Sequence, residues 1–256
     1  MKKLVHALVL TGMVAMPALA LADDAASSLT ANVSLTSNYV FRGISQTGGD
    51  AAIQGGFDYT HSSGAYIGTW ASNVGWIEDF QGYTTGNVEI DVYGGYRNSF
   101  GPVSYDLGLI QYSYPGSRPA GTVNADTTEA YASLGWKWFT VKYSYYLSNQ
   151  VFGFDKADGS DYWDLSGSLP IADTGLTAGA HWGTFKFRNN GNQDYDDWKA
   201  SLTYDLGKLG KAASGMTAGV MYTDTNAKQA YWSNPAGKGG AFLGKGTTTV
   251  WLSKSF

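Results

Sequence analysis

Nine charged residues occupy polar positions of segments in which polar and apolar side chains alternate. Side chains at every second position of an extended chain share one face, so these charges would line a common interior if the segments closed into a barrel. Rings of acidic or basic side chains set the ion selectivity of pores. Paired carboxyl groups can also hydrolyse a substrate bond, and ion pairs can simply fill the interior of a small barrel. The acids outnumber the bases, which favours cations weakly. The nine residues are Asp58, Glu89, Asp91, Arg97, Asp106, Glu129, Lys142, Asp164 and Lys199.

The histidines offer the best lead to enzyme chemistry. His61 directly precedes Ser62, and an imidazole can remove the proton of a serine hydroxyl in a hydrolase. Adjacent residues of an extended chain point to opposite faces, so we expect His61 to belong to a turn instead. His181 falls on the polar face of its segment, where we expect a lumen-facing bystander. No cluster has metal-ligand spacing, and the sequence predicts no metal and no cofactor.

A glycine-rich stretch near the end of the chain resembles a phosphate-binding loop without matching it. Residues 239–246 end in Lys245-Gly246, where that motif needs Ser or Thr for magnesium, and a strand pattern follows where a helix should begin. The surrounding residues 226–246 carry lysines and no acid. This basic loop could fold inward as a constriction, meet lipopolysaccharide phosphates, or be merely solvated, which is the simplest interpretation.

Twelve alternating segments position these residues. Each approaches the roughly 9–11 residues that a tilted strand needs to cross a membrane. The pattern predicts an all-β chain, a closed antiparallel transmembrane β-barrel of about twelve strands. The expected strands are Ala31–Phe41, Ala51–Thr60, Ala65–Val74, Asn87–Arg97, Val103–Ser113, Thr127–Trp136, Trp138–Ser148, Asp161–Leu169, Leu176–Phe187, Asp196–Asp205, Met216–Thr223 and Thr247–Phe256.

The connections between these segments support a barrel over a soluble β-sandwich. Short turns such as residues 61–64 and 98–102 alternate with long loops such as residues 75–86 and 114–126. Outer-membrane barrels have short periplasmic turns and longer external loops. Tyrosine and tryptophan gather near strand ends, as in the aromatic girdles of such barrels. An even strand number also places both termini in the periplasm.

The start of the chain reads as an export signal. Lys2 and Lys3 precede the mostly apolar run Leu4–Met16, and Ala20–Ala22 offers a cleavage site. We expect residues 1–22 to be a signal peptide and residues 23–256 to form one barrel domain in the outer membrane of a Gram-negative bacterium. Cleavage lowers the 17 basic residues to 15 against 21 acidic ones, a formal charge of −6. That balance argues against nucleic acid as a partner.

The remaining composition fits this class. The chain has no cysteine, so neither disulfides nor thiolate metal sites are possible. No segment after the signal reaches 18 consecutive apolar residues. The terminal Phe256 resembles the signal that barrel assembly machinery reads in a C-terminal strand. Outer-membrane lipid and lipopolysaccharide are the other expected partners.

Three blocks carry a family resemblance: Asn32–Thr47, Gln54–Tyr59 and Tyr66–Val74. The first contains the specific stretch Phe41-Arg42-Gly43-Ile44-Ser45-Gln46. Together they resemble the TorF-type porin family of Proteobacteria. The resemblance implies an outer-membrane pore and brings no established substrate.

The sequence therefore favours a porin that lets small hydrophilic solutes diffuse through a charged, water-filled lumen. Eight strands nearly fill a barrel with side chains and sixteen leave a channel, so twelve strands allow a narrow or plugged lumen. Two alternatives stay open. One is an outer-membrane barrel enzyme that hydrolyses lipids or peptides, and the other is a plugged barrel with a structural or adhesive role.

Overall fold

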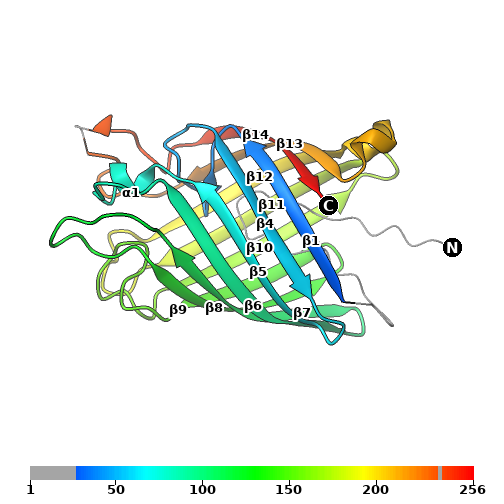
Figure 1. The fold of residues 1–256 in the computed structure, drawn as a ribbon, viewed down its shortest axis with the longest axis horizontal. Coiled ribbons are helices and arrows are strands. Elements are labelled where there is room, and N and C mark those ends of the chain that lie inside the picture. Colours follow the sequence, from blue (N-terminus) through cyan, green and yellow to red (C-terminus); the bar gives the residue numbers. More distant parts are fainter. Residues whose placement is uncertain (1–26, 236–237) are drawn as a thin grey trace.

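The computed structural model describes residues 27–235 and 238–256. The expected signal peptide, residues 1–22, lies outside this part of the chain. Twelve antiparallel strands form a closed barrel in which β1 pairs with both β4 and β14, so the wall has no free edge (Figure 1). The wall strands are β1 (Ser28–Thr36), β4 (Ala52–Thr60), β5 (Ala65–Asn73), β6 (Val88–Phe100), β7 (Val103–Ser113), β8 (Thr127–Trp136), β9 (Phe139–Tyr146), β10 (Asp161–Pro170), β11 (Leu176–Lys186), β12 (Tyr195–Asp205), β13 (Met216–Thr225) and β14 (Thr247–Ser255). The predicted fold class is confirmed.

The first strand is where the sequence prediction was wrong. We expected it to run over Ala31–Phe41, but β1 ends at Thr36 and the chain then turns into the barrel. Residues 37–50 form what we call the inner hairpin, with the short strands β2 (Val40–Phe41) and β3 (Ile44–Ser45). Gly43 adopts a φ of +78° at its turn. Apolar side chains at alternating positions are stabilised equally by lipid and by an aromatic interior, since both environments remove these side chains from water.

The two faces of the wall follow the predicted alternation. In β8, Glu129 and Tyr131 are buried inside while Ala132 and Leu134 are exposed outside. The third expected strand was ambiguous in sequence. In β5, Tyr66 is buried on the inner face and Ile67 is exposed on the outer one.

The connections separate by length onto the two ends of the barrel with one exception, since residues 206–215 at the short-turn end outnumber residues 187–194 at the long-loop end. Short connections, at residues 61–64, 101–102, 137–138, 171–175 and 206–215, define the short-turn end. The last of these contains the 3-10 helices η1 (Leu206–Leu209) and η2 (Lys211–Ala213). The long-loop end carries residues 74–87, 114–126, 147–160, 187–194, 226–235 and 238–246, with the short helix α1 (Trp76–Asp79) (Figure 1). In the described residues, no helix has the length and apolar character needed to cross a membrane.

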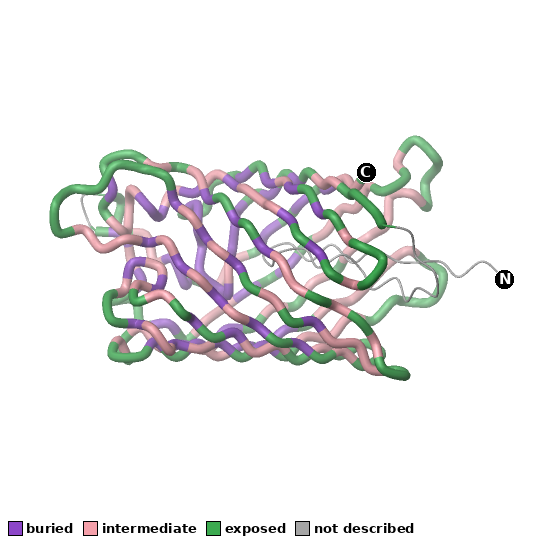
Figure 2. Tube along the Cα trace, turned by 60° about the horizontal axis from the view of Figure 1, so that its bottom comes forward, coloured by how far each residue is buried: buried purple, intermediate pink, exposed green. Residues whose placement is uncertain are grey.

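Burial is uneven along the barrel axis. Fully buried stretches gather in the half near the long loops, and half-buried or exposed stretches dominate toward the short-turn end (Figure 2). Glycines let aromatic rings lie flat against the inner wall in several places. A Cβ on Gly183 would stand 2.0 Å from the Tyr162 hydroxyl, and one on Gly108 would stand 2.6 Å from the Tyr131 ring. These glycines therefore make room for the polar tyrosines that organise the lumen.

Candidate functional site

All nine charged residues singled out in the sequence have their side chains on the inner face of the wall. The six acids are each 5% exposed or less, while Arg97, Lys142 and Lys199 are only half-buried. The structure thus brings the set into one lumen. Their role in lining a pore stays a prediction.

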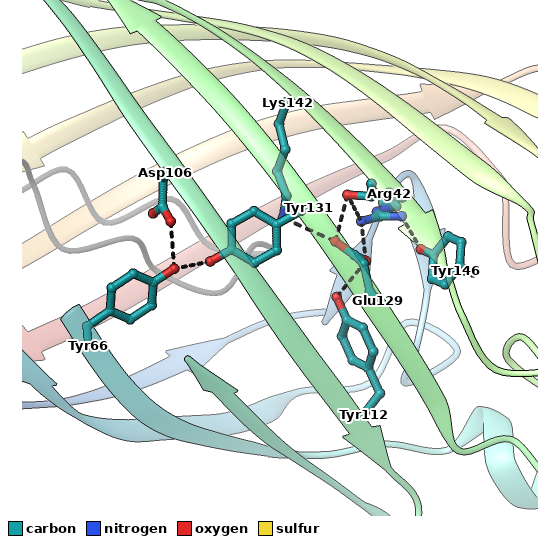
Figure 3. A network of polar contacts seen from close by, with 9 residues as sticks. Arg42, Tyr66, Asp106, Tyr112, Glu129, Tyr131, Lys142 and Tyr146 are labelled. Atoms are coloured by element: carbon teal, nitrogen blue, oxygen red, sulfur yellow. Dashed lines mark hydrogen bonds and ion pairs between the residues drawn. The ribbon is translucent and has the colours of Figure 1, made fainter. Parts of the chain in front are cut away.

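Glu129 is the centre of the largest polar network (Figure 3). Its carboxylate lies 2.8 Å from the Arg42 guanidinium and 3.3 Å from Lys142 Nζ. It also accepts hydrogen bonds from Ser144 Oγ at 2.6 Å and from Tyr112 Oη at 3.1 Å. Glu129 is fully buried, and these four donors compensate the loss of water around its charge.

Arg42 connects the inner hairpin to the wall. Its guanidinium donates to Ser144 Oγ at 3.2 Å and to the Tyr146 hydroxyl, and it lies 4.1 Å from the centre of the Tyr162 ring. Burial alone disfavours the charge, but the Glu129 carboxylate outweighs burial and raises the pKa of Arg42 well above its usual value. The hairpin is therefore held by a charged side chain with several partners on the opposite wall.

A second network lies nearer the short-turn end. Tyr66 Oη donates to Asp106 Oδ1 at 2.7 Å and also contacts the Tyr131 hydroxyl (Figure 3). The Arg97 guanidinium lies 3.8 Å from the centre of the Tyr66 ring, a cation–π distance. Asp58 accepts from Tyr93 Oη at 2.6 Å in the same way. Tyrosine hydroxyls thus cover the two acids of this region.

His181 faces the lumen, as the sequence predicted, and is the centre of a third network; its role as a bystander stays a prediction. Its Nδ1 lies 2.9 Å from Asp164 Oδ2, and its Nε2 lies 2.9 Å from Asp197 Oδ1. Ser166 Oγ is 3.4 Å from Nδ1, but it donates to Asp164 Oδ1 at 2.5 Å. A serine nucleophile needs its base free to take the hydroxyl proton. Here a carboxylate faces each ring nitrogen, which favours an ion cluster over a hydrolase triad.

Glu89 and Asp91 lie toward the long-loop end and differ from the other acids. Glu89 accepts from Tyr39 Oη of the inner hairpin at 3.0 Å. In the described residues, no basic nitrogen lies within 4.0 Å of either carboxylate. Both are 2% exposed or less, so the space around them is filled by protein.

Aromatic side chains close the long-loop end of the lumen, and we call this packing the aromatic plug. The space left among them admits water-sized molecules over about 30 Å³. One water needs about 10–15 Å³ by this measure, so the space holds about two waters. The plug comes from the inner hairpin, α1, the long loops and the upper wall, with Phe41, Ile44, Trp76, Phe80, Phe152, Phe185, Phe187, Tyr195, Trp232 and Leu243 around the space.

Comparison with known proteins places the chain in a family. A family model described as "Bacterial protein of unknown function (Gcw_chp)" matches residues 21–256. The chain belongs to the Gcw_chp family. No curated protein sequence matches it.

Solved structures show what this Gcw_chp chain is similar to in fold. A structure of the KdgM porin matches with a TM-score of 0.52 and 10% identity, covering 90% of this chain and 99% of that one. A structure of the NanC porin matches with a TM-score of 0.53 and 12% identity, with the same coverage. At such identities the likeness shows a shared barrel fold.

Two important residues of this Gcw_chp chain escaped the sequence analysis. Asp197 has the same parity as Lys199 on β12, and that parity could have revealed it. Arg42 stood at the start of an expected loop, with no signal that the loop folds inward. Its place in the Phe41–Gln46 block was the available hint.

The remaining sequence leads resolve in part. His61 Nδ1 lies 2.9 Å from Ser63 Oγ in an exposed turn, as ordinary turn chemistry predicts. Trp232 and Leu243 of the basic loop are buried in the aromatic plug, so this loop does fold inward, through apolar side chains. In the described residues, no group of three or more histidines and carboxylates is arranged to hold a metal.

Proposed function

We propose that this protein is an outer-membrane channel of porin type in a Gram-negative bacterium, through which small hydrophilic solutes diffuse passively. The observation that carries the proposal is the inversion of the barrel: apolar side chains cover its outside and charged networks fill its inside. Leu29, Ile53 and Leu134 are 60–72% exposed on the outer face. Soluble proteins rarely expose such a continuous apolar surface, whereas a bilayer buries it.

The fold of the chain supports this proposal. The TorF-type resemblance and the barrel shared with the KdgM and NanC porins agree with a pore. In this proposal residues 1–22 direct export, the strand ending at Phe256 is read by barrel assembly machinery, and lipopolysaccharide surrounds the long-loop end. Both ends of the described chain lie at the short-turn end, which then faces the periplasm (Figure 1).

The lumen suggests how passage is controlled. Toward the short-turn end its wall presents half-buried Ser and Thr side chains and Gly backbone, as at Thr177, Gly179 and Ser201. Toward the long-loop end the inner hairpin and the aromatic plug fill it. Passage of a solute therefore requires the hairpin to move away from the wall, and the Arg42–Glu129 contact is what holds it there.

The same plug favours a second candidate, a closed barrel with a structural or adhesive role. Planar bilayer recordings of the refolded mature chain, residues 23–256, distinguish the two. A channel gives discrete conductance steps in salt solution, and a heat-unfolded sample of the same preparation gives none. Folded protein that inserts and carries no current over long recordings supports the plugged barrel and contradicts the channel.

A further inference from the structure

The acids and bases of the lumen differ in their access to water. In the described strands, seven acidic side chains lie on the inner face between the two ends, and all are 5% exposed or less. They are Asp58, Glu89, Asp91, Asp106, Glu129, Asp164 and Asp197. The three inner bases, Arg97, Lys142 and Lys199, remain half-buried. Acids therefore outnumber bases on the inner face, while the charged side chains with more access to water are the bases.

Each network shows how an acid is covered. Tyrosine hydroxyls close over Asp58 and Asp106, and Glu129 is enclosed by four donors. The bases Arg97 and Lys142 instead place their charged groups against the faces of tyrosine rings. Lys142 Nζ lies 4.1 Å from the centre of the Tyr131 ring and its side chain stays 18% exposed. Long basic side chains can bury their stems along apolar surface. The Lys142 ammonium contacts the Glu129 carboxylate at 3.3 Å and keeps part of its side chain exposed to the lumen.

The three bases lie on one half of the wall. Arg97 is on β6, Lys142 on β9 and Lys199 on β12, so neighbouring bases are three strands apart, and the way back from β12 through β14 and β1 to β6 spans six strands. At the rim of the short-turn end, Asp205 is half-buried, and its carboxylate accepts from Gly207 N at 2.8 Å to cap η1. Above that rim, the half-buried charged side chains of the inner wall are these three bases, which form an arc over the half of the wall from β6 to β12.

We propose that this arc of bases makes the short-turn half of the lumen a vestibule that attracts small hydrophilic anions, such as carboxylates or phosphates. This inference rests on the proposed function, because it names the solute class of that channel. It reverses the weak cation preference expected from the excess of acids in the sequence. Rings of basic side chains select anions in pores.

The test measures the potential inside the vestibule directly and needs no current. The chain has no cysteine, so a Ser201→Cys variant carries one thiol on the inner face of β12. We compare its reaction rates with two methanethiosulfonates of similar size, one bearing a sulfonate and one a trimethylammonium group. A Ser62→Cys variant, exposed in the turn at the same end, corrects for the intrinsic rates of the two reagents.

The expected preference follows from the distance to Lys199. Residues two apart on a strand are separated by about 7 Å. One isolated positive charge at that distance in water favours the anionic reagent about sevenfold at low salt and about threefold at 0.1 M salt. The charges of Asp164 and Asp197 act on Lys199, so these values are the upper limits of the expected preference. Lys199→Met should remove most of this preference. Lys186→Met, on the outer face of the neighbouring strand, should not change it.

A corrected ratio of one or below at Ser201→Cys overturns the proposal, as does a ratio that Lys199→Met leaves unchanged. If Ser201→Cys fails to fold, Thr203→Cys on the same face of β12 replaces it, with the same expectation and the same refutation. The thiol reacts from the open end whether or not the plug moves. Absent conductance with an anionic preference therefore contradicts the channel alone, and conductance without that preference contradicts this inference alone.

Discussion

Replacing Arg42 by methionine should release the inner hairpin from the barrel wall. The variant keeps the bulk of the side chain and removes its charge. Arg42 makes a charge-assisted hydrogen bond to Glu129 at 2.8 Å, a class of contact that contributes about 1.5–3 kcal/mol. Its position 4.1 Å from the Tyr162 ring centre adds about 1–2 kcal/mol in a buried setting.

The net loss should be near the lower end of these ranges. Lys142 remains 3.3 Å from Glu129, so the carboxylate keeps one counter-charge after the substitution. We therefore expect the docked hairpin to lose about 3 kcal/mol relative to the released one. Since each 1.4 kcal/mol is tenfold, the released population should rise about 150-fold.

Thiol accessibility measures this population. Ser45 in β3 is 7% exposed, and a Ser45→Cys reporter changes the side chain little. When opening and closing are fast, its reaction rate follows the released fraction. Arg42→Met should raise that rate about 150-fold, and should leave a Ser117→Cys reporter, exposed in a long loop, unchanged.

Arg188→Met is the matched control. Arg188 also faces a carboxylate, Asp158, at 3.4 Å, but its side chain is 58% exposed. An exposed pair contributes little, so the Ser45→Cys rate should stay the same. If Arg42→Met also leaves that rate within twofold while the barrel retains its circular dichroism, Arg42 does not hold the hairpin and the reasoning is wrong.

Three further predictions concern stability. Glu129→Gln leaves the buried Arg42 charge without its carboxylate and should lower the free energy of unfolding by about 3 kcal/mol in urea titrations. The control Asp158→Asn, in an exposed pair, should change it by less than about 0.5 kcal/mol, and equal effects of the two variants would contradict the buried-network argument. Gly183→Ala places a Cβ 2.0 Å from the Tyr162 hydroxyl and should lower the free energy of unfolding by about 1–3 kcal/mol in the same assay. Gly191→Ala, whose Cβ would meet nothing within 4 Å, should change it little, and an unchanged stability of Gly183→Ala would refute the packing of this ring against the wall. Leu165→Arg puts a charge on the outer face of β10 and should lower the free energy of unfolding by about 2–4 kcal/mol in lipid vesicles. Unchanged refolding of this variant into vesicles would argue against a lipid-facing surface there.

The sequence predicted the barrel well because strand alternation is a local property. Val103–Ser113 and Thr127–Trp136 match β7 and β8 residue for residue. Side-chain parity follows from backbone geometry alone, so it also placed all nine charged residues inside the wall. The alternation of short and long connections was readable for the same reason.

Alternation does not say what an apolar face packs against. Tyr39 and Phe41 alternate as lipid-facing residues would, yet they belong to the inner hairpin and Tyr39 is 4% exposed. Burial among rings of distant loops and strands stabilises them as a bilayer would, and only the closed barrel brings those rings together. The end of β1 at Thr36 was therefore beyond the reach of a sequence argument.

The sequence by itself determined the number of strands, their inner and outer faces and the excess of acidic residues within. The tertiary structure alone decided which charges meet. Arg42 lies 87 positions from Glu129 in the chain, and Asp58 lies 35 from the tyrosine that covers it. Such pairs depend on the stagger of the strands around the closed wall and on the inner hairpin. For that reason the composition of the inner wall favoured cations, while between the two ends of that wall the charged side chains that are half-buried rather than buried are basic.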